Sequence, residues 1–191
     1  HFVPSMLLVW LEQEAFENLS SLQKVFCSGE ALSREAVNRF YKELPDCELH
    51  NLYGPTEAAI DVSYWHCEKD LDSRGMVPIG KPVSNTQLWV LDEQGQLLAP
   101  GVAGELHIGG VQLARGYLNR DDLNGNIFIE HTIEGVGRQR LYKTGDLVRQ
   151  RRDGVIEYLG RIDHQVKIRG YRIELGEIES RLQSIDGVAL S

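Results

Sequence analysis

The chain reads NLYGPTE at residues 51–57, a short polar turn between an apolar run and a second strand-like run. Gly54 leaves room for a ligand beside the backbone, Pro55 fixes φ near about −65°, and Thr56 offers a hydroxyl to an anionic oxygen. Glu57 follows directly, and a carboxylate beside a phosphate is repulsive unless a hard cation bridges the two. The turn therefore predicts a magnesium–nucleotide site. The alternative is a plain Gly-Pro turn in which Thr56 and Glu57 cap a short helix.

Composition narrows the class of protein. The 191 residues contain 20 basic and 28 acidic side chains, a net charge of −8, which argues against nucleic acid or a membrane surface as the main partner. The hydrophobic content of 42% is that of a globular protein, and the length suits one large domain or parts of two. The longest apolar stretch, residues 6–11, is far shorter than the ~20 residues that span a bilayer. Because the chain begins at His1 and not at Met, we expect it to be a piece of a longer protein.

The three cysteines indicate a reducing compartment. Cys27, Cys47 and Cys67 lie far apart and show no Cys-x-x-Cys spacing. They are typical of buried free thiols and not of a disulfide framework or a zinc site. We therefore expect a cytoplasmic protein.

A βαβ unit leads into the 51–57 turn. The pattern predicts a strand at residues 24–27, a helix that begins at Ser33 and runs to about Leu44, and a strand at residues 48–53. Ligands bind at the carboxyl ends of such strands. Two flanking elements complete this layer, an amphipathic helix and a further strand, expected at residues 6–22 and 60–65.

The rest of the chain has a different pattern of glycines and apolar residues. Glycines punctuate short strand-like runs, which predicts a small barrel-like or sandwich-like β unit. Its expected elements are strands at 87–91 and 105–108, a short helix at 121–128, a strand, turn and strand at 140–148, and a hairpin into 155–159. A strand at 166–169 then turns at Gly170-Tyr171 into a final helix ending near Gly187. The predicted fold is α/β, divided into a βαβ layer, a small β-barrel-like subdomain and the start of a C-terminal α+β subdomain, at residues 1–66, 67–160 and 161–191.

Six motifs in a fixed order resemble the adenylation domains of nonribosomal peptide synthetases. Together they cover essentially the whole chain, and this combination is far more specific than any one of them. They are GEAL at 29–32, NLYGPTE at 51–57, GELHIGG at 104–110, LARGY at 113–117, YKTGD at 142–146 and the stretch GRIDHQVKIRGYRIELGEIE at 160–179.

The resemblance implies a two-step reaction. An amino acid carboxylate attacks the α-phosphorus of ATP, with Mg²⁺, to give an aminoacyl-adenylate and pyrophosphate. The phosphopantetheine thiol of a carrier protein then takes the acyl group. The resemblance also leaves room for a small MbtH-like helper protein.

The resemblance assigns roles residue by residue. Thr56 would bind an α-phosphate oxygen and Glu57 the Mg²⁺. Asp146 would accept the ribose hydroxyls, although Gly-Asp is also a frequent turn dipeptide. Asp163 would be the hinge of the rotating C-terminal subdomain. The catalytic set is Thr56, Glu57 and Asp163. The nucleotide-binding set is Gly29, Glu30, Asn51, Tyr53, Gly54, Thr56, Asp146, Tyr158 and Arg161.

The amino acid pocket carries over from the same family. The implied lining is Phe26, Ser28, Leu52, Ile60 and Asp61. This order looks like the second half of the selectivity pattern of serine-activating domains. The chemistry is consistent with that resemblance, because Ser28 or Asp61 can pair with a small substrate hydroxyl in an otherwise apolar pocket. The alternative is that these are core residues of the βαβ layer. Outside the pocket, Lys167 and Arg169 are interpreted as ordinary solvated strand residues.

Three parts of the family's site have no counterpart in these residues. The Ser/Thr/Gly-rich phosphate loop and the Asp that anchors the substrate amino group would precede His1, and a late Lys would follow Ser191. We therefore expect little or no adenylating activity from the isolated chain. Two other interpretations remain, another adenylate-forming enzyme such as an acyl-CoA ligase, and a non-catalytic nucleotide-binding or interaction module.

Overall fold

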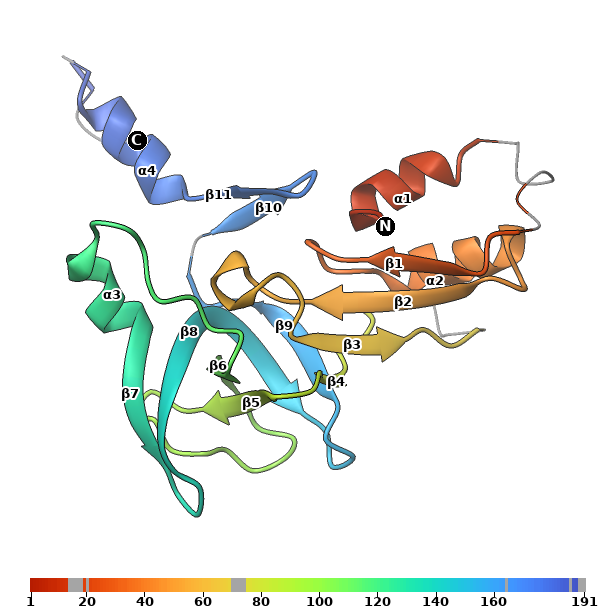
Figure 1. Cartoon of the computed structure of the whole chain (residues 1–191). Helices are drawn as coiled ribbons and strands as arrows, with labels where there is room; N and C mark the ends of the chain where they lie inside the picture. Colours follow the sequence, from red (N-terminus) through yellow and green to blue (C-terminus); the bar gives the residue numbers. More distant parts are fainter. Residues whose placement is uncertain (14–18, 20, 70–74, 164, 186, 189–191) are drawn as a thin grey trace.

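A computed structural model describes residues 1–13, 19, 21–69, 75–163, 165–185 and 187–188. Figure 1 shows an α/β layer beside a curved second sheet, with a C-terminal arm above the second sheet. Within the described ranges, no helix is long and apolar enough to cross a membrane.

The α/β layer contains the predicted βαβ unit. Strand β1 (Lys24–Cys27) pairs in parallel with β2 (Glu48–Tyr53), and helix α2 (Arg34–Glu43) connects them. Strands β3 (Ser63–His66) and β4 (Lys81–Pro82) extend the sheet in antiparallel fashion, in the order β1-β2-β3-β4. The carboxyl ends of β1 and β2 therefore lie at one edge of the sheet, as predicted.

Helix α2 packs its apolar face against the strands of this layer. Ser33 caps it by accepting a hydrogen bond from the Ala36 amide at 3.1 Å, as its sequence position predicts. Phe40 is fully buried on its apolar face and packs in the same cluster as Cys27 and Leu49. Burial of each such side chain contributes about 1.5–3 kcal/mol. The three cysteines are buried free thiols, as expected.

Two expectations for this layer are wrong. Helix α1 (Pro4–Trp10) ends well before residue 22, and part of the expected remainder, residues 14–18 and 20, lies outside the described residues. The expected strand at 60–65 begins only at Ser63, because a 3-10 turn at Thr56–Ala58 is followed by left-handed backbone at Ala59 and Ile60. Left-handed conformations are incompatible with a strand.

The second sheet is antiparallel and open. Its order is β5-β6-β8-β7, and β9 also pairs with β8. The bounds are β5 Thr86–Leu91, β6 Ala103–Gly110, β7 Phe128–Ile133, β8 Gly137–Gln150 and β9 Ile156–Arg161. The ladder does not close into a barrel within the described ranges, so the barrel-like unit is a curved open sheet. Helix α3 (Asp121–Ile127) leads directly into β7.

A single continuous strand, β8, runs through residues 140–148, where the sequence predicted a strand, a turn and a second strand. Glu105 of β6 pairs with Leu147 and His107 with Lys143, so three residues, 144–146, lie opposite one residue of the partner strand. This is a β-bulge, in which extra residues are accommodated without ending the strand. Gly145 at φ 68° supplies the left-handed conformation that it requires.

The C-terminal arm is a hairpin followed by a helix. Strands β10 (Val166–Ile168) and β11 (Tyr171–Ile173) pair in antiparallel fashion. The turn is at Arg169-Gly170, one residue earlier than predicted, because these two residues have φ of 52° and 80°. Helix α4 (Leu175–Gln183) follows and ends before Gly187.

Candidate functional site

A cleft opens at the carboxyl ends of β1 and β2. It adjoins a second cleft that extends along the 54–56 turn toward the C-terminal hairpin. The first cleft is lined by Gly29, Glu30, Ala31, Asn51, Leu52, Tyr53, Gly54, Val77, Ile79, Asp146, Tyr158 and Lys167. Thr56 and Arg161 line the second. The structure thus brings the whole predicted nucleotide-binding set together at two adjoining clefts.

Asn51 offers an unsatisfied acceptor to the first cleft. It is 2% exposed, and its Nδ2 donates to the carbonyl of Pro78 at 2.9 Å. Its Oδ1 is buried without a hydrogen-bond partner. Since buried polar atoms are nearly always paired, this carbonyl suits a ligand that carries an N–H donor, such as the amino group of adenine.

Gly29 and Glu30 line the same cleft. Gly29 has φ 89°, a conformation that favours glycine over residues with a Cβ. The Glu30 carboxylate accepts hydrogen bonds from the Ser5 amide at 3.1 Å and the Gly170 amide at 2.7 Å. Glu30 therefore joins the α/β layer to the C-terminal hairpin.

Asp146 lines both clefts and is the centre of a polar network. It accepts hydrogen bonds from the Tyr53 hydroxyl and, at 2.9 Å, from Arg161 Nη1. Arg161 also donates to the Thr144 carbonyl at 2.8 Å and to both carboxylate oxygens of Asp163. Burial and then the charge of Asp146 hold the pKa of Tyr53 well above its usual range. The hydroxyls of a ribose bound at this position would take the place of these hydrogen-bond donors to Asp146.

The Thr56–Glu57 turn is shaped by a close backbone approach. A Cβ on Gly54 would lie 2.1 Å from the carbonyl oxygen of Ile60, so only glycine fits there. Thr56 is exposed at the start of the short 3-10 helix, whereas Glu57 is 6% exposed. Ile60, with φ 79°, is a β-branched residue in a strained conformation, which is typical of functional sites.

Glu57 is a buried carboxylate with one occupied and one free oxygen. Its Oε1 accepts hydrogen bonds from the Tyr117 hydroxyl at 2.5 Å and from Arg172 Nη1 at 2.7 Å. Its Oε2 is buried without a partner. Burial raises the pKa of Glu57, but the Tyr117 hydrogen bond and the charge of Arg172 outweigh that effect and lower it. The side chain is therefore ionised at neutral pH.

The predicted amino acid pocket is only partly gathered. Leu52 lines the first cleft, and Ser28 and Ile60 line the second. Asp61 and Phe26 are absent from the described linings of both clefts. Asp61 is half-buried, its Oδ1 has no hydrogen-bond partner, and burial raises its pKa. The hydroxyl of Ser28 lies 2.8 Å from Nε2 of His1.

Phe26 belongs to an aromatic stack across three strands. Its ring stacks on His50 at 5.1 Å, and His50 stacks on His66 at 4.8 Å. Together with Glu48, the two histidines offer three metal-ligating atoms within 4.8 Å of one another. The Glu48 carboxylate is already paired with Lys24 at 3.0 Å and His50 at 2.9 Å. Because Lys24 and His50 both already contact Oε2 of Glu48, we interpret the group as an ion-paired cluster that packs beside Phe26 and not as a metal centre.

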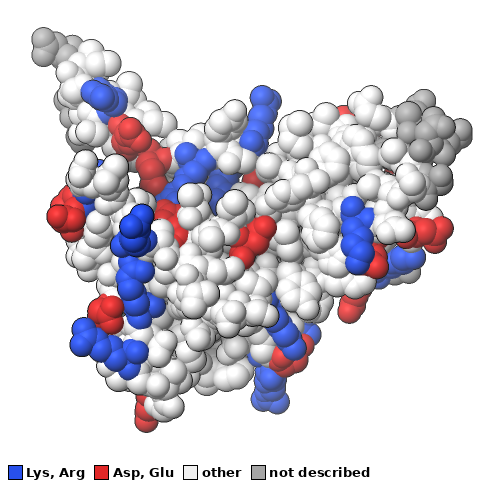
Figure 2. Space-filling view, in the orientation of Figure 1, with Lys and Arg blue, Asp and Glu red and all other residues white. Residues whose placement is uncertain are grey.

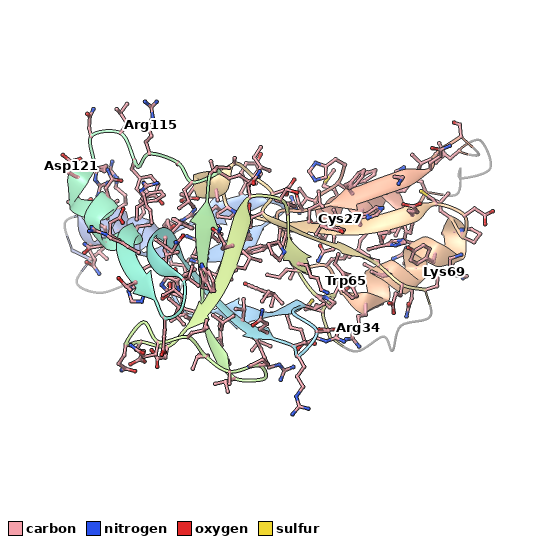
Figure 3. All side chains as sticks on the ribbon, turned by 60° about the horizontal axis from the view of Figure 1, so that its bottom comes forward. Cys27, Arg34, Trp65, Lys69, Arg115 and Asp121 are labelled. Carbon is pink, nitrogen blue, oxygen red and sulfur yellow. The ribbon has the colours of Figure 1, made fainter. Side chains whose placement is uncertain are left out.

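Sequence reasoning missed three residues of the site. Tyr117 and Arg172 contact Glu57, and Lys167, assigned to a solvated strand, lines both clefts. Tyr117 lies within the LARGY motif and Arg172 within the 160–179 stretch, so the motifs contained the signal. Figure 3 shows Arg115, which belongs to the LARGY motif, and Asp121 at one end of the molecule, and Lys69 of the α/β layer at the other end.

Comparison with known proteins identifies the family. The pattern of the AMP-binding enzyme family matches residues 1–118. Phosphinothricin tripeptide synthetase PhsB of Streptomyces viridochromogenes is 53% identical over 182 residues, which are 95% of this chain and 15% of that protein. Tyrocidine synthase 3 of Brevibacillus parabrevis is 50% identical over 186 residues, 97% of this chain and 3% of that protein. The chain belongs to the AMP-binding enzyme family.

Solved structures agree with this assignment. Holo-PA1221, a nonribosomal peptide synthetase protein containing adenylation and carrier domains, matches with a TM-score of 0.88 and 33% identity over 96% of this chain. The Vibrio cholerae adenylation domain AlmE, in complex with glycyl-adenosine-5'-phosphate, matches with a TM-score of 0.80 and 36% identity over 95% of this chain. The chain covers 32% and 34% of these two structures. The resemblance to part of a nonribosomal peptide synthetase adenylation domain is thereby confirmed.

Proposed function

We propose that the chain is the nucleotide-facing part of an amino-acid adenylation domain in nonribosomal peptide synthesis. The parent protein would activate an amino acid with ATP to the aminoacyl-adenylate and then load it onto a carrier-protein thiol. The single observation that supports this best is the convergence of Thr56, Asn51 and the Asp146 network at two adjoining clefts, with Glu57 lining a third cleft beside Tyr117 and Arg172. Such an arrangement would accommodate the adenine, ribose and phosphate of one nucleotide.

The residues present fit a nucleotide. The unpaired Oδ1 of Asn51 would accept from the adenine amino group, and the rings of Tyr53 and Tyr158, which line the same cleft, would pack against the base. Asp146 would bind the ribose hydroxyls, with Arg161 beside it. The exposed hydroxyl of Thr56 would donate to an α-phosphate oxygen.

The residues present also fit Mg²⁺. This ion takes oxygen ligands, and the buried carboxylate of Glu57 has one oxygen without a partner. When bound, Mg²⁺ neutralises charge on the phosphates. Glu57 is ionised at neutral pH and so would hold the ion, whereas Thr56 and the turn backbone would orient the phosphate for in-line attack.

We propose L-serine as the amino acid. Asp61 lies outside the lining of both clefts but directly follows Ile60, which lines the second. Its half-buried carboxylate has an oxygen without a partner, and a substrate hydroxyl that reached past Ile60 would supply the missing donor. Alanine would leave that acceptor unpaired, a cost that discriminates against it. Replacing Asp61 with Ala in the parent protein is expected to reduce the preference for serine over alanine by about 10- to 100-fold.

The remaining assignments follow from the family. Asp163, bonded to Arg161 next to the C-terminal arm, would be the hinge between the two half-reactions. The boundaries 1–66, 67–160 and 161–191 would separate the core, the β-rich unit and the moving subdomain. Partners would be a phosphopantetheinyl carrier protein and an MbtH-like protein. The buried free thiols support a cytoplasmic location.

Amino-acid-dependent ATP–pyrophosphate exchange by the parent protein tests this function. Exchange that is fastest with serine supports the full proposal, and exchange with a different amino acid refutes only the serine assignment. Fatty-acid-dependent exchange would instead indicate an acyl-CoA ligase, and no exchange would indicate a non-catalytic module. The isolated 191-residue chain should give little or no exchange, and robust exchange by it would contradict that part of the proposal.

A further inference from the structure

The bulge at residues 144–146 of β8 is fixed by side-chain hydrogen bonds. Leu106 of β6 lies opposite these three residues, so the regular pairing of the two strands is interrupted there. The Leu106 carbonyl accepts a hydrogen bond from the Thr144 hydroxyl at 2.7 Å. The same hydroxyl accepts one from the Asp146 amide at 3.0 Å. Thr144 is 4% exposed, so both contacts are shielded from water.

Glu105 fixes the middle of the bulge. Its Oε1 accepts a hydrogen bond from the Gly145 amide at 3.0 Å. Gly145 has left-handed backbone, and its carbonyl accepts a hydrogen bond from the Ile162 amide at 2.9 Å. Both polar groups of this peptide unit's central residue are therefore satisfied, and the backbone that leads into Asp146 has one defined path.

The bulge also determines where the Asp146 carboxylate lies. Tyr142 and Val148, on the same side of the strand by alternation, are buried in an apolar cluster. Alternation alone would direct Asp146 toward that cluster, where a carboxylate is costly. The carboxylate instead lines both clefts and accepts hydrogen bonds from the Tyr53 hydroxyl and Arg161 Nη1. Bulges commonly re-aim a side chain in this way next to a functional site.

Charges of both signs surround this carboxylate. Figure 2 shows basic and acidic side chains gathered below the C-terminal arm, whose β10–β11 hairpin lines the second cleft. Arg161 pairs with both Asp146 and Asp163. A hydrogen bond weakens steeply as its angle departs from linear. The direction in which the Asp146 oxygens point therefore matters to a neutral ligand such as a sugar hydroxyl more than the mixed local charge does.

We propose that Thr144 and Glu105 are positioning residues that act through Asp146 to determine how tightly the site binds the hydroxyls of a ribose. This inference rests on the proposed function, in which Asp146 binds that sugar. Thr144 fixes the amide of Asp146, and Glu105 fixes the amide before it. The carboxylate is thus oriented before a ligand arrives, and a preoriented acceptor loses less freedom on binding.

The test compares ATP with 2′,3′-dideoxy-ATP, which lacks only the two sugar hydroxyls. Binding of each to the parent protein is measured by isothermal titration calorimetry without amino acid, so that no adenylate forms. The unsubstituted protein should bind ATP about 10- to 100-fold more tightly, because hydrogen bonds to a charged acceptor are strong. In Thr144→Val, which keeps the shape but removes the hydroxyl, this ratio should fall to about threefold or less.

Conservative variants separate position from stability. Thr144→Ser restores the hydroxyl and should restore the ratio. Glu105→Leu removes the acceptor of the Gly145 amide and should lower the ratio, whereas Glu105→Gln retains an oxygen acceptor and should keep it. The Glu105 pair tests the proposal even if Thr144→Val is too unstable to purify, because Glu105 is only partly buried. Thr132→Val, at an exposed position of β7, is the control and should leave the ratio unchanged.

Affinity for 2′,3′-dideoxy-ATP separates a local effect from general damage. It should change by less than about twofold in every variant, because the proposed adenine and phosphate contacts do not involve the bulge. A variant that loses affinity for both nucleotides equally would contradict the positioning role. A failure of Thr144→Ser to restore the ratio would also overturn it, because the hydroxyl would then not be the cause.

The outcomes distinguish this inference from the proposed function. Preference for ATP that is intact in the unsubstituted protein and unchanged in Thr144→Val and Glu105→Leu would overturn the inference alone. Absence of ATP binding, or equal binding of the two nucleotides by the unsubstituted protein, would instead refute the nucleotide site on which the proposed function depends.

Discussion

Replacing Glu57 with Gln in the intact adenylation domain separates the metal-binding role of this side chain from its structural role. Gln keeps a carbonyl oxygen for the Tyr117 hydroxyl and for Arg172, both of which now contact Oε1. Changing a charged to a neutral acceptor costs about 1 kcal/mol, and the 40% exposure of Arg172 reduces this further. The melting temperature should therefore fall by no more than about 2–4 °C.

The effect on activity should be much larger. An amide is neutral and holds Mg²⁺ weakly, and loss of one electrostatic contact at the reacting phosphate typically costs about 100-fold, or about 2.7 kcal/mol. ATP–pyrophosphate exchange measured at limiting Mg²⁺ should fall by that factor and recover in part at saturating Mg²⁺. Unchanged rates at limiting Mg²⁺ would refute the metal role of Glu57. A melting temperature that falls by 10 °C or more would show that the loss is structural.

Two stability predictions follow from the same region. Gly54→Ala should destabilise the domain by about 3 kcal/mol, because its Cβ would lie 2.1 Å from the Ile60 carbonyl oxygen. Gly176→Ala in α4 should not destabilise it, because nothing lies within 4 Å of the added Cβ. Chemical denaturation of both variants checks this prediction. Asp61→Asn should stabilise by about 1 kcal/mol at pH 7. The folded-state pKa of Asp61 is raised, so its ionisation costs stability as pH rises from its ordinary pKa of 3.8 toward the folded value. The melting-temperature gain of Asp61→Asn should therefore shrink toward pH 4, and a gain that is independent of pH would contradict this reasoning.

Sequence patterns that act over a few residues correctly predicted the strands and the helix cap that depend on short-range interactions. The strands at 24–27 and 48–53 have the predicted bounds, and Ser33 caps α2 as expected, because alternation and capping act over a few residues. The left-handed Ile60 did not follow from its β-branched side chain, which favours a strand in isolation. Close packing of its carbonyl against Gly54 overrides that preference.

Long-range contacts were the part of the site that the sequence did not reveal. The motifs placed Tyr53, Asp146 and Arg161 in one nucleotide site, and the structure brings them within hydrogen-bonding distance. The pairing of Arg172 with Glu57 joins segments 115 residues apart, and no periodicity encodes such a contact. Arg172 therefore resembles any charged residue on an exposed strand until the hairpin is placed in space.

The bulge in β8 also constrains how this segment tolerates insertions and deletions. It adds two residues to one strand, an even number, so the alternation of side chains is the same before and after it. Tyr142 on one side and Val148 on the other are accordingly buried in the same core cluster. Loss of a single residue here would reverse which side chains of the following half of β8 face the core, whereas loss of two would preserve the alternation. Homologous chains that retain the fold are therefore expected to differ in length here by pairs of residues.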